Sequence, residues 1–324
     1  NIHNPTSKEA LKIALYRIVF EEFLILQLGL FMFKNGTTEV EGIKFNRDEN
    51  LDNILKALPF KLTNAQNRAL NEIIEDMQSN KVMNRLVQGD VGSGKTVVAL
   101  LALANCVLNG YQGALMAPTE ILAEQHYISL SETLKPFGME IELLVGSLTK
   151  KQKEKVLERV KNKEIDILIG THALIEDKVE FNNLGIVITD EQHRFGVRQR
   201  EAISEKGEHP HIMVMSATPI PRTLAIIMYG DLDISVIDEL PANRLPIANC
   251  VVGTDYRPNA YDFMTKQIAK GRQVYVICPT VEYSEAVEGE NVIEYAEKLK
   301  RIMPVSVNIE FLHGRMKPAE KNEI

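Results

Sequence analysis

Apolar and polar residues follow two different rhythms along this chain, and each rhythm predicts a different kind of element. Residues 7–34 are mostly apolar without strand-like alternation, which predicts one long helix with Ser7 as its N-cap. Residues 51–58 predict a short helix. Thr63 is then expected to cap a helix over residues 64–78, where apolar residues return at helical spacing. The first part of the chain is therefore predicted to be helical.

The most apolar stretch, residues 20–33, lies inside the first predicted helix. It is too short to cross a bilayer, and it carries Glu21, Glu22 and Gln27. We therefore expect a buried or domain-bridging helix and no membrane partner.

From residue 86 onward, short apolar runs alternate with helical segments. Strands are predicted at residues 85–88, 113–117, 140–144, 165–170, 186–190 and 211–216, with helices at 121–134 and 150–161 among the segments between them. Such alternation predicts an α/β fold, with a parallel sheet covered by helices on both faces. Because ligands bind at the carboxyl ends of parallel strands, polar motifs that follow the strands should gather at one edge. Five such motifs occur, at residues 89–96, 117–119, 170–172, 190–191 and 216–218.

The pattern restarts after residue 240. Strands are predicted at residues 248–253, 273–278 and 305–312, and helices at 258–270 and 291–303. The boundaries give a helical linker over 1–55, an α/β domain over 56–240 and a second α/β unit over 241–324. At 84 residues this second unit is short for a doubly wound domain, so we expect an incomplete domain. A naturally small second domain is the alternative.

Charge and cysteine content narrow the functional classes. The formal net charge of −7 argues against a wholly basic nucleic-acid binder, although local basic patches remain compatible with it. Cys106, Cys250 and Cys278 are far apart and show neither a disulfide framework nor metal-ligand spacing, which fits a reducing cytosol.

Residues 89–96 read Gly-Asp-Val-Gly-Ser-Gly-Lys-Thr between a predicted strand and a predicted helix. This is the phosphate-binding pattern G-x-x-x-x-G-K-[ST], in which glycines let backbone amides close around a phosphate at a helix N-terminus. Lys95 is expected to reach the β- and γ-phosphates of ATP, and the Thr96 hydroxyl to bind Mg²⁺. The loop backbone that would bind the phosphates comprises Gly89, Gly92, Ser93 and Gly94. The alternative is an ordinary glycine turn.

Asp190 and Glu191 follow the apolar run 184–189 and would complete an ATPase site. We expect Asp190 to hold Mg²⁺ through water and Glu191 to polarise the attacking water. The alternative is that the two acids belong to an ordinary loop. In the first interpretation, Asp190, Glu191 and Lys95 form the predicted catalytic set.

Gln192 and His193 complete the sequence Asp-Glu-Gln-His, which together with Ser-Ala-Thr at 216–218 resembles superfamily 2 helicases. The chain is more closely similar to the RecG-type branched-DNA helicases along essentially its whole length. The matching segments are residues 88–96, 116–126, 170–175, 190–197, 216–223 and 313–321. Transcription-repair coupling factors share Pro-Ile-Pro-Arg-Thr (219–223) but typically have Asp-Glu-Glu-Gln, so 190–193 favour the RecG type.

The resemblance implies a RecA-like fold, with ATP and Mg²⁺ as cofactors. It also implies ATP-dependent helicase action on forks and Holliday junctions in recombination and repair. Residues 56–240 would be the ATP-binding domain, and 241–324 part of the second motor domain. The implied setting is the bacterial cytoplasm, and a monomer is expected. A coupling-factor-type translocase and a nucleotide-dependent DNA-binding scaffold are the alternatives.

Individual roles follow from the same resemblance. Phe60 and Gln66 match an adenine-binding motif, although Gln66 alone could be a solvated helix residue. Matches to DNA-backbone contacts are Thr119, Thr171, His172, His313 and Arg315, and matches to residues that couple hydrolysis to movement are His193, Ser216 and Thr218. Helix capping is the alternative for Thr119, and a strand-end turn for His313. The arginine motif Gln-x-x-Gly-Arg-x-Gly-Arg and the N-terminal wedge domain are not in this sequence, so we expect ATP binding but poor hydrolysis.

Overall fold

The computed structural model describes residues 2–37, 41–190, 206–218, 232–241, 247–282 and 289–324. Two compact units make up the chain, Asn1–Arg244 and Leu245–Ile324. Their division lies close to the boundary expected after residue 240.

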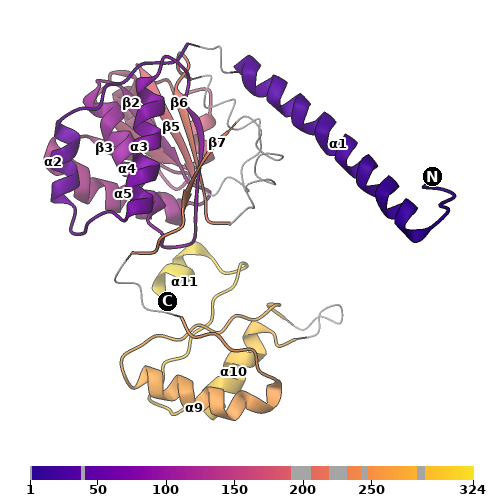
Figure 1. Cartoon of the computed structure of the whole chain (residues 1–324). Coiled ribbons are helices and arrows are strands. Elements are labelled where there is room, and N and C mark those ends of the chain that lie inside the picture. Colours follow the sequence, from indigo (N-terminus) through magenta and orange to yellow (C-terminus); the bar gives the residue numbers. More distant parts are fainter. Residues whose placement is uncertain (1, 38–40, 191–205, 219–231, 242–246, 283–288) are drawn as a thin grey trace. The chain divides into compact units, whose positions relative to one another are not determined.

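The first unit contains a seven-stranded sheet in the order β3-β4-β2-β5-β6-β1-β7 (Figure 1). The strands are β1 Asn84–Gly89, β2 Gln112–Met116, β3 Ile141–Leu144, β4 Ile167–Gly170, β5 Leu184–Asp190, β6 His211–Ser216 and β7 Asp233–Ile237. Every neighbouring pair is parallel, which confirms the predicted RecA-like α/β class. The edge strand β7 was not predicted, because only two of its five side chains are buried and its apolar signal is weak.

Six α-helices are described in the first unit. They are α1 Lys8–Thr37, α2 Asn50–Ala57, α3 Asn64–Gln78, α4 Lys95–Leu108, α5 Glu120–Leu134 and α6 Lys150–Lys161, with 3₁₀ turns at Lys135–Phe137 and His172–Ile175. Ser7 accepts a hydrogen bond from the Ala10 amide (3.1 Å), as expected of an N-cap. Thr63 caps α3 at the predicted residue and forms a reciprocal capping box with Gln66.

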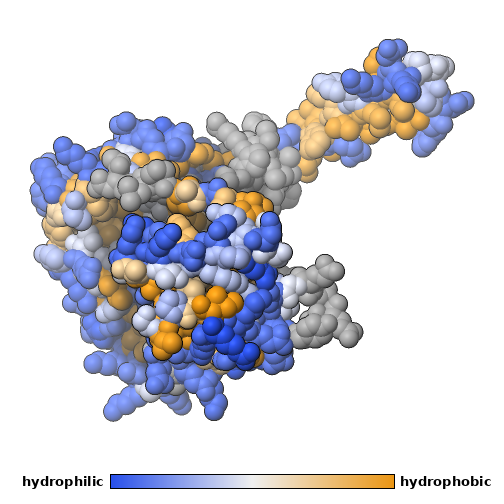
Figure 2. Space-filling model, turned by 90° about the horizontal axis from the view of Figure 1, so that it is seen from below, coloured by the Kyte–Doolittle hydropathy of each residue, from blue (hydrophilic) through white to orange (hydrophobic). Residues whose placement is uncertain are grey.

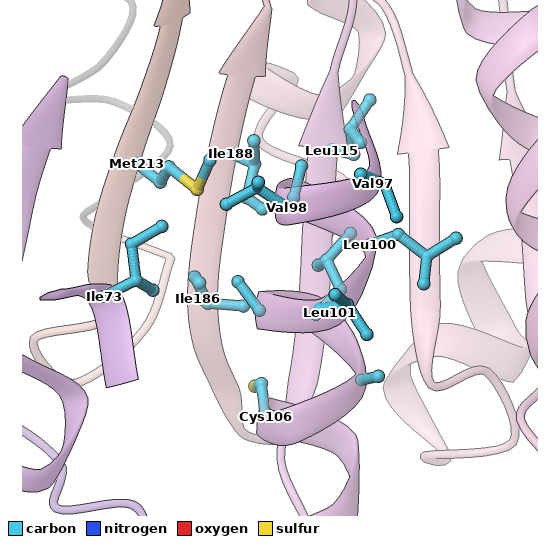
Figure 3. Packing of buried hydrophobic residues seen from close by; sticks show 14 of the residues in the cluster. Ile73, Val97, Val98, Leu100, Leu101, Cys106, Leu115, Ile186, Ile188 and Met213 are labelled. Atoms are coloured by element: carbon cyan, nitrogen blue, oxygen red, sulfur yellow. The ribbon is translucent and has the colours of Figure 1, made fainter. Parts of the chain in front are cut away.

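The main core lies between α4 and the sheet. The side chains of α4 are buried from Val97 to Cys106, and those of Val98 and Leu101 gather beside Ile186 and Ile188 of β5 (Figure 3). Burial of each such aliphatic side chain contributes about 1.5–3 kcal/mol. Burial also raises the pKa of the Cys106 thiol, which therefore stays protonated and unreactive. The packing fixes α4 and, with it, the loop that precedes the helix.

The opposite face of the sheet has a smaller core. Val187, which alternates with Ile186 and Ile188 on β5, packs with Val156 and Val160 of α6. Helices therefore cover both faces of the sheet, as predicted from the alternating pattern.

Gln112, at the start of β2, closes the amino edge of the sheet. Its buried amide nitrogen donates to the carbonyls of Val160 (3.0 Å) and Ile165 (2.7 Å). Its amide oxygen accepts from the backbone of Asn182 (2.8 Å) and Asn183 (3.2 Å). One side chain thus links the end of α6, the segment before β4 and the segment before β5, with both ends of its amide satisfied.

Helix α1 is not the buried helix that was one of the two expectations, and the domain-bridging alternative stays a prediction. Many of its large apolar side chains are exposed, among them Ile13, Tyr16, Ile25 and Met32, and Figure 2 shows apolar surface along it. No helix in the described part of the chain is long and apolar enough to cross a membrane.

The second unit contains the helices α9 Arg257–Ile268, α10 Val292–Ile302 and α11 Pro318–Glu323, and a 3₁₀ turn at Thr254–Tyr256. The strands predicted at 248–253, 273–278 and 305–312 were wrong: no strand is assigned among the described residues there. Val251, Ile277 and Val305 are almost fully exposed. Apolar residues alone do not make a strand, because strand pairing requires a partner.

Candidate nucleotide-binding site

The carboxyl edge of the sheet brings together motifs that are far apart in sequence. Asp190 of β5 lies opposite Met215 of β6, whose next residue, Ser216, lies opposite Gln88 of β1. On the other side of β1, Gly89 pairs with Ile237 of β7. The expected glycine loop therefore begins one strand away from Ser216 and two strands away from Asp190.

The glycine loop has the backbone that its composition predicts. Gly92 and Gly94 have φ angles of 77° and 85°, a region that favours glycine. The Ser93 amide donates to the Asp90 carbonyl (3.1 Å), while the buried Ser93 Oγ has no hydrogen-bond partner among the described residues. A Cβ on Gly89 would lie 2.5 Å from this Oγ. The loop therefore has no room for a side chain at Gly89.

The amino end of α4 continues this polar surface. Gly94 is the N-cap of α4 and provides no side-chain cap, so the first helical amides depend on other acceptors. Lys95 Nζ donates to the Gly89 carbonyl (2.7 Å) and the Asp90 carbonyl (3.0 Å), which holds the cation over the loop. Thr96, the next residue, is half-buried in the first turn of α4.

Gln66 joins α3 to the loop. It is 2% exposed, which rules out the solvated position that was its alternative. Its Nε2 donates to the Ser93 carbonyl (2.7 Å), and its Oε1 accepts from the Thr63 amide (2.9 Å). Phe60, four residues before α3, is 51% exposed and so presents ring surface.

Asp190 has a partner that sequence reasoning missed. His126 Nε2 lies 2.8 Å from Asp190 Oδ2, and both side chains are mostly buried. His126 lies on the buried face of α5 with Ala123, Leu130 and Leu134. A histidine within an apolar helical stripe was the available signal. Glu191 and His193 lie outside the residues that the structure describes.

The remaining predicted residues of the first unit follow other strand ends. Thr119 caps α5, accepting from the Leu122 amide (3.3 Å), a role that can coexist with a DNA contact. Thr171 is buried and His172 exposed directly after β4. Ser216 Oγ lies 2.8 Å from Thr218 Oγ1, which ties the turn after β6 to the strand.

Within the second unit, His313 stacks on Phe311 with ring centroids 5.9 Å apart. Its Nδ1 is buried without a hydrogen-bond partner in the described part of the chain. Arg315 pairs with Glu282 (3.0 Å) in an exposed position. These two residues lie two apart in an irregular segment rather than at the end of a strand.

The parallel sheet and the positive-φ glycine loop between β1 and α4 are the features of a RecA-like domain with a phosphate-binding loop pattern. The family model described as DEAD/DEAH box helicase matches residues 63–227, about half of the chain. The chain therefore belongs to the DEAD/DEAH box helicase family, and membership implies use of a nucleotide.

Within that family, the chain is similar along its length to RecG. It is 48% identical to the ATP-dependent DNA helicase RecG of Bacillus subtilis, over 100% of this chain and 48% of the relative. It is 49% identical to RecG of Aquifex aeolicus, over 94% of this chain and 39% of the relative. The predicted resemblance to RecG-type helicases is confirmed. The chain spans about half of the length of these relatives or less.

Solved structures agree with this assignment. A structure of RecG bound to a three-way DNA junction superposes with a TM-score of 0.78 at 40% identity, covering 92% of this chain and 39% of that one. The helicase MrfA bound to DNA superposes with a TM-score of 0.60 at 18% identity, covering 87% of this chain and 43% of that one, and so supports the fold alone.

Proposed function

We propose that this chain is the ATP-binding motor part of an ATP-dependent DNA helicase that acts on branched DNA. The observation that carries the proposal is the phosphate-loop geometry beside Asp190 at one sheet edge, in a chain about 48% identical to RecG of Bacillus subtilis. Its proposed setting is the bacterial cytoplasm. Residues 56–240 would be the ATP-binding domain, 241–324 part of the second motor domain and 1–55 a linker.

The residues present fit a nucleotide. The unpartnered buried hydroxyl of Ser93 and the positive-φ glycines create a small polar cradle that a Cβ at Gly89 would fill. The uncapped amino end of α4 adds amide donors and a favourable dipole for phosphate. Phe60 would offer a ring face to the adenine. Gln66 already uses both ends of its amide on Ser93 and Thr63, so only its second Nε2–H would be left for the base.

The residues also fit Mg²⁺ as a companion of the nucleotide. Mg²⁺ keeps several waters and takes only one or two protein ligands together with substrate phosphates. Asp190 and Thr96 would hold it, and the ion would neutralise charge on the phosphates when bound. A dedicated cage is not needed, and no cluster of three or more His, Cys, Asp or Glu ligands occurs in the described part of the chain.

Each residue then has a distinct task. Lys95 exchanges its contacts with the loop carbonyls for contacts with the β- and γ-phosphates. Glu191 polarises the attacking water, and His126 keeps one carboxylate oxygen of Asp190 in place. Ser216, Thr218 and His193 would couple hydrolysis to movement.

DNA would be held through its backbone. Thr119, Thr171 and His172 at strand ends of the first unit, and His313 and Arg315 in the second, have hydroxyl, imidazole and guanidinium groups suited to phosphate contacts. The bound junction in the RecG structure supports branched DNA as the partner.

Two variants test the ATP site. Lys95→Ala should weaken ATP binding at least tenfold in calorimetry, because the triphosphate loses its fixed cation. Glu191→Gln should bind ATP and Mg²⁺ normally but abolish hydrolysis in the full-length protein. Unchanged affinity of Lys95→Ala would contradict the phosphate-loop assignment.

The substrate is tested by ATP hydrolysis of the full-length protein on forked DNA and on linear duplex of equal length. Stronger stimulation by the fork supports the helicase proposal. Equal stimulation favours the translocase, and absence of turnover with tight DNA binding favours a scaffold.

A further inference from the structure

The amino-terminal turn of α3 contacts two parts of the molecule at once. One is the phosphate loop, through the Gln66 Nε2 bond to the Ser93 carbonyl (2.7 Å). The other is the segment that leaves the sheet after β7, residues 238–240. This double contact places α3 between the proposed ATP site and the chain that runs toward the second unit.

Glu239 makes the central contact. Its Oε2 accepts a hydrogen bond from the Ala65 amide (3.2 Å). Ala65 is the second residue of α3, so its amide is one of the four that lack a partner within the helix. Glu239 therefore supplies both the missing acceptor and a negative charge at the positive end of the helix dipole.

Arg68 makes a second contact one turn further along α3. Its guanidinium donates to the Val236 carbonyl (3.0 Å) and to Asp238 Oδ1 (2.8 Å). The side chains of Arg68 and Asp238 are 50% and 65% exposed, so the ion pair contributes little to overall stability. Such a contact can be formed and released at small cost.

The strand that leads into residues 238–240 also touches the loop directly. Ile237, the last residue of β7, pairs with Gly89, the first residue of the loop. A Cβ on Gly89 would approach the Ile237 carbonyl to 3.0 Å. The loop, α3 and the end of β7 with the exit segment that follows it (residues 238–240) thus form a closed ring of contacts.

We propose that Glu239 and Arg68 are positioning residues that couple the phosphate loop to the segment joining the two units, through the first turn of α3. The inference rests on the proposed ATP-binding function and adds residues that do not touch the nucleotide. Holding α3 fixes Gln66, Gln66 fixes the loop, and a loop fixed in advance binds ATP more tightly. Because binding coupling is reciprocal, bound ATP should strengthen the hold on the exit segment.

The first test measures ATP affinity with a fluorescent ATP analogue. Glu239→Ala should weaken binding about five- to tenfold, within the usual range of coupling between sites. Glu239→Gln keeps an acceptor of the same shape and should bind within about twofold of the original chain. Arg68→Met should weaken binding about two- to threefold, since a surface ion pair contributes less.

Arg159→Met is the matched control. Arg159 pairs with Glu142 (2.7 Å) and Glu140 (3.7 Å) beside β3, at the opposite edge of the sheet from β7. Its loss removes partly exposed ion pairs without touching α3, so ATP affinity should not change. Equal weakening in Arg159→Met and Arg68→Met would overturn the proposal.

The second test is hydrogen exchange of the Ala65 amide. Exchange should quicken at least fivefold in Glu239→Ala and return toward the original rate in Glu239→Gln. Addition of ATP should slow this exchange in the original chain and have no effect in Glu239→Ala.

The outcomes separate the two proposals. If the original chain binds ATP and Glu239→Ala binds it equally well, the coupling is wrong and the proposed function stands. If the original chain does not bind ATP, both fall. Should Glu239→Ala fail to fold, Arg68→Met and its control give the same decision.

Discussion

Substituting Gly94 by alanine tests the contact between Gln66 and the phosphate loop. Gly94 has a φ of 85°, and its added Cβ would lie 2.2 Å from Gln66 Nε2. Gly110 offers a matched control, because its φ is 82° and nothing lies within 4 Å of its added Cβ. Both substitutions force alanine into the left-handed region, but only one displaces a neighbour.

The two substitutions should lower the free energy of unfolding by different amounts, because only Gly94→Ala disturbs the hydrogen bonds of Gln66. Left-handed strain costs about 1–2 kcal/mol at either position. At Gly94, the flexible Gln66 amide must also move, which breaks its bond to the Ser93 carbonyl and disturbs its bond to the Thr63 amide. Each net hydrogen bond contributes about 0.5–1.5 kcal/mol, so Gly94→Ala should cost about 1–3 kcal/mol more than Gly110→Ala.

Urea unfolding followed by far-ultraviolet circular dichroism measures both costs. In a Gln66→Ala background the excess cost at Gly94 should vanish, because the displaced side chain is gone. An excess that persists in that background beyond about 0.5 kcal/mol would refute the reasoning.

Three further predictions concern the metal, pH and salt. His126→Ala should raise the Mg²⁺ concentration needed for half-maximal ATP binding about tenfold, because Asp190 loses the group that orients it as a metal ligand. An unchanged Mg²⁺ titration would contradict this. Burial lowers the pKa of His211, which accepts from the Met83 amide and donates to the Ile43 carbonyl as a neutral ring. Its stabilisation is complete above the unfolded pKa of about 6.5 and is lost as pH falls toward the lowered folded pKa, by up to about 1.4 kcal/mol per pH unit. Urea unfolding at several pH values should show a smaller slope for His211→Asn than for the original chain. Binding of the chain to forked DNA, measured by fluorescence anisotropy, should weaken steeply between about 50 and 200 mM salt; salt-independent binding would argue against backbone contacts.

Local signals predicted most of the first unit. Thr63 as the cap of α3, the limits of α6 and six of the seven strands follow from side-chain periodicity and capping chemistry, which operate over a few residues. Two errors show the limit of this reasoning. Strand β7 was missed, and strands were predicted at residues 248–253, 273–278 and 305–312 of the second unit, where none forms among the described residues. In both places the outcome depends on a neighbouring strand rather than on the apolar character of the segment itself.

The candidate site divides in the same way. The glycine loop is contiguous in sequence, so its chemistry could be predicted from residues 89–96 alone. The contacts of His126 with Asp190, of Gln66 with Ser93 and of Glu239 with Ala65 join residues 64, 27 and 174 positions apart. Such contacts arise from strand order and helix packing, which the spacing of a single sequence does not encode.

Gln112 has a consequence for how this domain can vary during evolution. At this buried position the side chain must donate two hydrogen bonds and accept two from backbone amides. Glutamine has the length and the amide group to do both. Glutamate would set a charge against two carbonyls, asparagine is one carbon short, and methionine would leave four backbone groups unsatisfied. Selection should therefore hold this residue almost invariant, although it lies at the amino ends of the strands and the proposed ATP site at their carboxyl ends. Its invariance would reflect a structural requirement rather than a catalytic one.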